Sequence, residues 1–462
     1  MSKRSKTRTG DVMETIRSEI SSRRLIPGDR LPSIRSFAAK MSVAPSTVVE
    51  AYDRLAAEGL IRARAGSGFY VSGPAAPFVL AHTAPKLDRA IDPFWVSRQS
   101  LDTDEKVLKP GCGWLPAEWM PNDAIRRAIR NLAKAEKSIL SDYGVTRGSL
   151  ALRRLLTRQF SEERIGISPD QILLTGSGTQ AIDLICRFFL RPGDTVLVDD
   201  PCYFNFHALL RAHQVTVVGV PYTSEGPDLA RFAEAVTNSA PHLYITNSAL
   251  HNPTGATLSP QIAHQILNIA TSHKMIVVED DIFAGFEPEP SPRLAALDGL
   301  SSVIRIGSFS KTLSSSIRCG YIAARPDWIE ALIDLQIATS FGGVSPVAAE
   351  LVLSTLSDGT YRKHLEDLRQ KLLRLRRTVT SRLESLEIQP WLMPRGGFYL
   401  WCRLPNRHDA ATVARAALHE GVLLAPGDVF SASQTASMFM RFNIVHTNHP
   451  SVFTVLERIL KS

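Results

Sequence analysis

The stretch Ile306-Gly-Ser-Phe-Ser-Lys-Thr-Leu313 carries Lys311, and three further serines lead from it to Arg318. The apolar run 303–306 predicts a short strand that ends in a loop of small hydroxyl residues. A lysine amine can form an imine with an aldehyde, and serine hydroxyls with a guanidinium can hold a phosphate beside it. Ser308, Lys311 and Arg318 are therefore candidates for one site, although a solvated lysine on a polar loop would look the same locally.

Short apolar runs alternate with amphipathic stretches over most of the chain. The runs that we interpret as strands are 171–174, 195–198, 215–220, 243–246, 275–278, 303–306 and 319–323. This alternation predicts an α/β fold with a mainly parallel seven-stranded sheet and helices on both faces. In open sheets of this kind, functional residues collect at the carboxyl ends of the strands, and the Lys311 loop lies at one of them.

Small residues follow the first of these strands. The sequence Thr175-Gly-Ser-Gly-Thr-Gln-Ala181 opens a predicted helix, and free N–H groups at a helix start attract anions. Ser177, Gly178 and Thr179 are candidates for holding a phosphate. An ordinary helix cap is the alternative interpretation.

Polar residues also follow two later strands. The run 243–246 leads to His251-Asn-Pro-Thr-Gly255, in which Asn252 can donate a hydrogen bond and can precede a cis proline. The strand that begins at Ile276 enters three acidic residues, and strand parity places Asp280 on the same side as Val278. A cluster of capping acids remains the alternative there.

The C-terminal run 439–445 alternates like a strand, so Arg441 and Asn443 share one face. A guanidinium can hold a carboxylate through two hydrogen bonds. Arg441 is therefore a candidate for binding a carboxylate, with a structurally paired arginine as the alternative.

The first 73 residues have a different character. They hold 13 Lys/Arg against 7 Asp/Glu, a balance of +6 out of +8 for the whole chain, which predicts a polyanionic partner. Apolar spacings predict helices at 11–22, from Pro32 and from Pro45, followed by a two-stranded wing around Gly66-Ser-Gly68. This geometry would place Ser46 and Thr47 at base edges in a major groove.

These motifs carry a family resemblance. From about Lys106 to the C-terminus the chain resembles the fold-type I aminotransferases, and its first seventy or so residues resemble the winged helix-turn-helix domains of GntR-type regulators. In this order the two resemble a MocR-type transcription factor. The resemblance implies a small C-terminal α+β subdomain and a homodimer, and it implies that DNA is faced by Arg35, Ser46, Thr47, Arg62, Arg64 and Gly66.

The resemblance also implies pyridoxal 5′-phosphate, linked to Lys311. Asp280, with Asp281 as second choice, would bind the pyridine nitrogen, Tyr203 would stack on the ring, and Asn252 would donate to the phenolic oxygen. Arg441 matches the carboxylate arginine of the family, and Tyr143 matches a tyrosine that reaches the neighbouring subunit's phosphate. Many relatives carry a second, tyrosine donor to the phenolic oxygen where this chain has Ile282 and Phe283, which weakens the case for efficient catalysis.

The expected domains are 1–73, a proline-rich linker over 74–105, and 106–462. Five scattered cysteines without CxxC spacing indicate buried reduced thiols, a cytoplasmic protein and no structural metal. No apolar run approaches the length of a membrane span or follows the basic N-terminus as in a signal peptide.

Three functions are compatible with this pattern. The first is a DNA-binding regulator that senses an amine or amino acid at Lys311. The second is a working aminotransferase whose front module docks on an acidic partner. The third is a DNA-binding protein whose large domain is an inert dimer scaffold.

Overall fold

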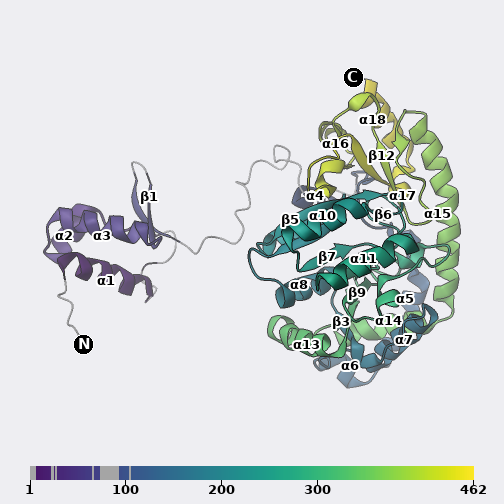
Figure 1. The fold of residues 1–462 in the computed structure, drawn as a ribbon, viewed down its shortest axis with the longest axis horizontal. Helices are drawn as coiled ribbons and strands as arrows, with labels where there is room; N and C mark the ends of the chain where they lie inside the picture. Colours follow the sequence, from purple (N-terminus) through teal and green to yellow (C-terminus); the bar gives the residue numbers. More distant parts are fainter. Residues whose placement is uncertain are drawn as a thin grey trace. The chain divides into compact units, whose positions relative to one another are not determined.

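A computed structural model describes residues 7–21, 25, 29–64, 67–72, 93–102 and 106–461. The chain divides into two compact units, Met1–Ala84 and Pro85–Ser462 (Figure 1). No helix among these described residues is long and apolar enough to cross a membrane. Each unit has a hydrophobic core of its own.

The small unit is a winged helix-turn-helix, as the sequence predicts. Its elements are α1 (Arg8–Ser21), α2 (Ile34–Met41), α3 (Pro45–Ala57), β1 (Ile61–Arg64) and β2 (Gly68–Val71). Ser33 caps α2 by accepting a hydrogen bond from the Ser36 amide at 3.2 Å, and Ser42 turns the chain toward α3 in the left-handed conformation. Tyr52 and Leu55 on α3 are fully buried in the core of this unit.

The large unit is built on an eight-stranded sheet in the order β3-β10-β9-β8-β7-β4-β5-β6 (Figure 1). The strands are β3 (Ile172–Thr175), β4 (Thr195–Asp200), β5 (Thr216–Thr223), β6 (Gly226–Pro227), β7 (Leu243–Thr246), β8 (Ile276–Asp280), β9 (Val303–Ser308) and β10 (Gly320–Ala323). Strands β5, β4, β7, β8 and β9 pair in parallel, and β10 is antiparallel to both neighbours. The expected seven strands are present, and the eighth, β6, has only two residues.

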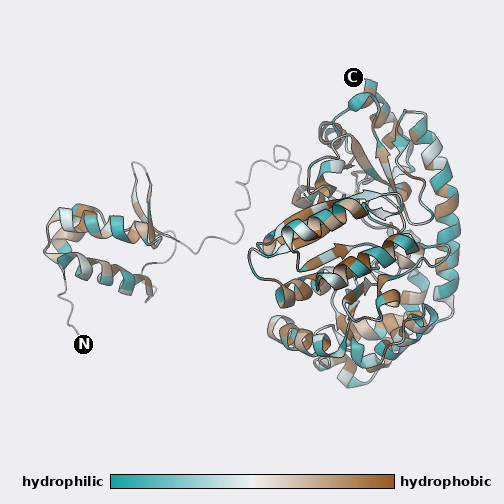
Figure 2. Ribbon diagram, viewed as in Figure 1, coloured by the Kyte–Doolittle hydropathy of each residue, from teal (hydrophilic) through white to brown (hydrophobic). Residues whose placement is uncertain are grey.

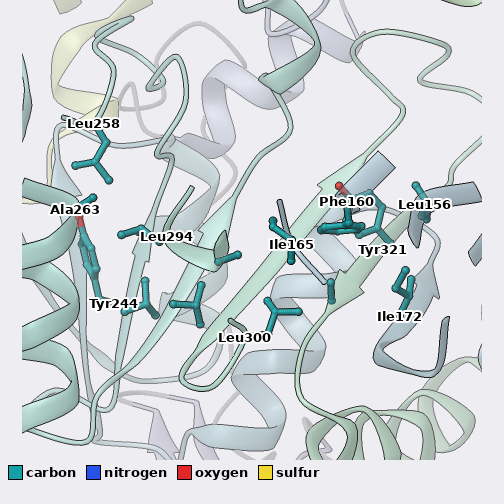
Figure 3. Close-up of a cluster of buried hydrophobic side chains, with 14 of the residues drawn as sticks. Leu156, Phe160, Ile165, Ile172, Tyr244, Leu258, Ala263, Leu294, Leu300 and Tyr321 are labelled. Carbon is teal, nitrogen blue, oxygen red and sulfur yellow. The ribbon is translucent and has the colours of Figure 1, made fainter. Parts of the chain in front are cut away.

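Helices cover both faces of this sheet. One face packs against α7 (Leu150–Glu162), α10 (Leu229–Ser239), α11 (Pro260–Ser272), α12 (Leu294–Asp298) and α14 (Pro346–Ser357), and part of that core is drawn in Figure 3. The other face packs against α8 (Gly178–Phe189), α9 (Phe204–Ala212) and α13 (Pro326–Ser340). On β8, Val277 belongs to the first core and Val278 to the second, which is the alternation that sequence parity predicts.

A small C-terminal α+β subdomain follows. Its antiparallel sheet has the order β11-β12-β14-β13, made of β11 (Gln389–Pro390), β12 (Tyr399–Arg403), β13 (Ala425–Pro426) and β14 (Phe439–Asn443). The remaining helices are α5 (Asn122–Leu132), α6 (Lys137–Ser141), α15 (Thr360–Glu384), α16 (Ala410–His419), α17 (Ile444–Thr447) and α18 (Pro450–Lys461). Figure 2 shows hydrophobic residues on the central strands, while the long helix α15 carries many hydrophilic ones.

Residues 93–102 differ from the sequence prediction of a linker over 74–105. They form a helix, α4 (Pro93–Asp102), whose Trp95 and Val96 are buried beside Phe204 and Phe430 of the large unit. The prediction is wrong for this segment. The apolar residues that hold the helix in place span only a few positions and do not repeat with a helical period, so the sequence showed no sign of a helix. The rest of the predicted linker, 74–92 and 103–105, lies outside the described residues.

Candidate functional site

A cavity of about 330 Å³ lies where the carboxyl ends of β4, β7, β8 and β9 meet the start of α8. We call it the Lys311 cavity. The predicted site residues that line it are Ser177, Gly178, Thr179, Tyr203, Asn252, Asp280, Lys311 and Arg318. Its wall also includes residues that the sequence did not single out for the site, among them Leu101, Ile182, Trp114, Asn247, Ser310 and Ser315. Ile282 and Phe283, neither of which carries a hydroxyl, line it as well.

Lys311 has an unusual environment for a lysine. Its Nζ donates a hydrogen bond to the Gly113 carbonyl at 2.5 Å, and no described carboxylate lies within ion-pair distance of it. Burial, followed by the positive charge of Arg441, lowers the pKa of Lys311 to about 8. At neutral pH this amine is therefore neutral far more often than an ordinary lysine amine, whose pKa is about 10.4.

Asp280 and Asp281, the two sequence candidates, have different surroundings. Asp280 lines the cavity, and its Oδ1 accepts a hydrogen bond from the Ile282 amide at 3.1 Å. Burial raises the pKa of Asp280 to about 7. Asp281 instead forms ion pairs with Arg293, at 2.9 Å, and with Arg305. Asp280 is thus the carboxyl group available to a ligand.

The start of α8 forms one end of the cavity. Ser177 is its N-cap, and Ser177 Oγ accepts a hydrogen bond from the Gln180 amide at 3.0 Å, so the side chain makes the ordinary cap while the helix start still faces the cavity. Ser308 does not line the cavity itself but lies behind Gly178 and donates to Ser310 Oγ at 3.1 Å. Arg318 lines the cavity with a left-handed φ of 55°, which is uncommon for a residue with a side chain.

Arg441 is fully buried on β14. It donates hydrogen bonds to Asn252 Oδ1 at 2.9 Å and to the Gly111 carbonyl at 2.8 Å, and its guanidinium lies 4.2 Å from the centre of the Tyr399 ring. No carboxylate among the described residues is within ion-pair distance of it, and Nε has no hydrogen-bond partner there. A buried guanidinium without a counter-ion favours an anionic ligand. The peptide bond between Asn252 and Pro253 is cis, as the sequence suggested.

Gly113 marks the place where these groups converge. A methyl group built on Gly113 would lie 3.5 Å from Tyr399 Oη, 3.8 Å from Lys311 Nζ and 4.0 Å from Arg441 Nη2. An amine that can react with an aldehyde and a guanidinium that can bind a carboxylate therefore lie close to one point. The sequence did not reveal this because Gly113 and Tyr399 are far from Lys311 in the chain and belong to no motif.

The two predicted tyrosines lie in different places. Tyr203 lines the cavity at the start of α9, and its ring packs against Phe206 with 5.4 Å between ring centres. Tyr143 is outside the cavity of its own chain and 78% exposed, with its ring edge on Phe341 at 5.1 Å. The action of Tyr143 in a neighbouring subunit stays a prediction.

The predicted DNA-facing residues lie on three elements of the small unit. Arg35 on α2, Ser46 at the start of α3 and Arg62 on β1 are exposed, and Thr47 is half-buried. The side chain of Arg64 and all of Gly66 lie outside the described residues. The start of α3 has no side-chain cap, because Ala44 precedes Pro45 there. Pro45 has no N–H and the Thr47 amide donates to the Ala44 carbonyl at 3.0 Å, so among these first residues the Ser46 amide is the one that could meet an anion.

Comparisons with known proteins agree with both units. The family "Aminotransferase class I and II" matches residues 110–459, and the family "Bacterial regulatory proteins, gntR family" matches residues 8–71. The uncharacterized HTH-type transcriptional regulator YdcR of Escherichia coli K12 is 30% identical over 440 residues, which is 93% of each chain. The HTH-type transcriptional regulator NorG of Staphylococcus aureus USA300 is 26% identical over 88% of this chain and 93% of its own.

Solved structures resemble the large unit. LysN, an α-aminoadipate aminotransferase of Thermus thermophilus complexed with N-(5′-phosphopyridoxyl)-L-leucine, matches with a TM-score of 0.72 and 25% identity over 79% of this chain and 94% of its own. The kynurenine aminotransferase of Pyrococcus horikoshii, solved with PMP, matches with a TM-score of 0.72 and 26% identity over 81% and 94%. The chain therefore belongs to the HTH-type transcriptional regulators of MocR-type architecture, in which a GntR-family domain precedes an aminotransferase class I and II domain.

Proposed function

We propose that this regulator binds pyridoxal 5′-phosphate at Lys311 and senses an amino acid there. The observation that carries the proposal is the convergence beside Gly113, where Lys311 Nζ and Arg441 Nη2 lie 3.8 Å and 4.0 Å from one point. The low pKa of Lys311, about 8, supplies the neutral amine that an aldehyde needs. The unpaired guanidinium of Arg441 supplies the site for a carboxylate.

The residues of the cavity fit this cofactor. The start of α8, Ser310 and Arg318 suit its phosphate, and the buried carboxyl of Asp280 suits a protonated pyridine nitrogen. Tyr203 offers an aromatic face for the ring. Since Asn252 Oδ1 already accepts from Arg441, its amide nitrogen is the group left to donate to a phenolic oxygen.

Each of the three residues Lys311, Asp280 and Arg441 would have a separate role. Pyridoxal phosphate would supply an aldehyde that condenses with amines. Lys311 would present its neutral amine, Asp280 would hold a proton at the ring nitrogen, and Arg441 would orient the carboxylate of the amino acid. Ile282 and Phe283 offer no hydroxyl to the phenolic oxygen, which favours sensing over rapid turnover.

Dimerisation is part of the proposal. Several apolar side chains near Tyr143 are exposed: Leu140 by 51%, Val145 by 64% and Phe341 by 67%. A patch of this kind is typical of an interface. A second copy of the chain that covers it would bring Tyr143 toward the neighbouring cavity.

The small unit would bind DNA. Arg35, Arg62 and the start of α3 would contact a double-stranded DNA operator in the cytoplasm, and occupation of the Lys311 cavity would change that affinity. Because phosphate contacts release counterions, DNA binding should weaken steeply as salt rises.

The test is Lys311→Ala in the full-length protein. Wild type loaded with pyridoxal phosphate should be yellow and change its DNA affinity when amino acids are added, and the variant should lose both properties. Lys363→Ala, an exposed lysine on α15, is the matched control and should keep both. A yellow Lys311→Ala protein, or a colourless wild type, would contradict the proposal. Steady turnover of an amino acid with a keto acid would favour the aminotransferase alternative.

A further inference from the structure

Helix α4 lines the Lys311 cavity at its last turn and is anchored in a hydrophobic core near its start. Near its start, Trp95 and Val96 are 2% and 1% exposed, whereas Leu101 in its last turn is 73% exposed and lines the Lys311 cavity. The helix is also the first described element of the large unit after the segment that leads from the small unit. A ligand that contacts Leu101 would therefore contact the element next in sequence to the DNA-binding unit.

The buried end of α4 packs beside the aromatic rings around Arg441. Trp95 and Val96 share a core with Phe204 and Phe430. The Arg441 guanidinium lies 4.7 Å from the centre of the Phe430 ring and 5.8 Å from that of Phe204. A carboxylate bound by Arg441 would thus lie near Phe204 and Phe430, the two rings that also pack against α4.

The exposed end of α4 offers an apolar contact. Among the described residues that line the cavity, the charged side chains are Asp280, Lys311 and Arg318, and the proposed cofactor uses all three. The wall that remains for an amino-acid side chain is mostly apolar or aromatic, with Asn247 and Ser315 as its uncharged polar members; its other residues are Leu101, Trp114, Ile182, Ile282 and Phe283. No described charged residue remains in that wall to pair with a second carboxylate or a second amine.

We infer that Leu101 packs on the side chain of the bound amino acid and that this side chain is large and apolar. Helix α4 then links the presence of the amino acid in the cavity to the DNA-binding unit. The inference rests on the proposed function, because it needs an amino acid held between Lys311 and Arg441. Leu101, which is 73% exposed, would then be a specificity-determining residue, because a large apolar side chain would bury its surface and a small or charged one would not.

The experiment uses full-length protein loaded with pyridoxal phosphate and measures the affinities of L-leucine, L-alanine and L-glutamate by calorimetry. Wild type should bind L-leucine tighter than the other two. Leu101→Ala should weaken L-leucine binding about tenfold, because a buried leucine contact is lost, and L-alanine binding by less than about twofold. Leu297→Ala removes an equally placed exposed leucine from the last turn of α12 and should change neither affinity.

A second measurement follows α4 itself. L-leucine should slow hydrogen exchange of the backbone amides of residues 96–102 in wild type and much less in Leu101→Ala. Leu101→Met, which keeps an apolar contact, should restore both the affinity and the protection.

The outcomes separate the two proposals. A loaded wild type that binds none of the three amino acids would overturn the proposed function and this inference together. A wild type that binds L-leucine no tighter than Leu101→Ala does would overturn the inference alone. Tighter binding of L-glutamate than of L-leucine would overturn the assigned effector class.

Discussion

Asp280 and Asp281 are adjacent at the end of β8 and almost equally buried, at 6% and 4% exposure, yet their surroundings are opposite. Asp281 pairs with two arginines, Arg293 and Arg305. Asp280 has no cation within ion-pair distance among the described residues, and burial raises its pKa to about 7. One peptide bond thus separates a neutralised carboxylate from one that the chain leaves without a counter-ion.

The same contrast extends to whole clusters. Around Asp281 the charges are matched, since Arg293 also pairs with Glu287 at 2.5 Å and Arg305 with Glu163. Around Asp280 they are not: Lys311 and Arg441 likewise lack a carboxylate partner among the described residues. The Asp281 cluster therefore neutralises its own buried charge, whereas the described charged groups around Lys311 do not pair with one another.

The largest expected effect comes from breaking the matched cluster. Asp281→Asn leaves two buried guanidinium groups short of a counter-charge, and the free energy of unfolding should fall by roughly 3–5 kcal/mol. Urea denaturation of the full-length protein measures it. Asp327→Asn removes an exposed ion pair with Arg325 and should leave the denaturation midpoint unchanged. A loss below about 1 kcal/mol for Asp281→Asn would show that the cluster is not a structural unit.

The next effect comes from Arg441, the buried cation near Lys311 that lacks a carboxylate partner among the described residues. Arg441→Gln removes a charged pair of donors from the proposed carboxylate site, and the affinity of the loaded protein for L-leucine should fall about 100-fold. 3-Methylbutylamine, which is leucine without its carboxylate, is the matched probe, and its affinity should be unchanged. Equal losses for both ligands would mean that Arg441 supports the cavity and does not bind the carboxylate.

Much of this arrangement follows from local sequence. The Lys311 loop, the Ser177-Gly178 helix start and the Asp280 position all come directly after strands, so strand parity and the edge rule for open sheets were enough to place them in one cavity. The preference for Asp280 over Asp281 came from the family resemblance. The winged helix-turn-helix could also be predicted from the sequence, because its helix caps and the spacing of its apolar residues are local features.

What the sequence did not reveal depends on distant contacts. Helix α4 exists because Trp95 and Val96 pack on residues more than a hundred positions away, so its own short sequence carries little signal. Leu101 and Trp114 reach the cavity through tertiary packing alone. The hydrogen bond from Arg441 to Asn252 joins two predicted residues in a pairing that spacing could not indicate.

The unmatched carboxyl of the cavity gives the third effect. Asp280→Asn removes the charge that would hold a proton on the pyridine nitrogen, and the affinity for pyridoxal phosphate should fall about 30-fold. Equilibrium dialysis of the full-length protein measures it. The fold should tolerate this change better than Asp281→Asn, because the pKa of Asp280 is about 7 and its neutral form is already populated. An equal loss of stability in both variants would remove the distinction between the two acids.

The smallest effect is the pH dependence of cofactor loading, and its sign follows from the lowered pKa of Lys311. Only the neutral amine attacks an aldehyde, and with a pKa of about 8 it forms about a tenth of the population at pH 7 and most of it at pH 9. The loading rate of the cofactor-free protein should thus rise about tenfold over this range and then level off, as stopped-flow absorbance can show. A lysine with the ordinary pKa would keep gaining about tenfold per pH unit up to about pH 10. Since the negative charge of Asp280 raises the pKa of Lys311, Asp280→Asn should move the plateau to lower pH, and a plateau that moved upward would show that the two groups are not coupled as their positions in the cavity imply.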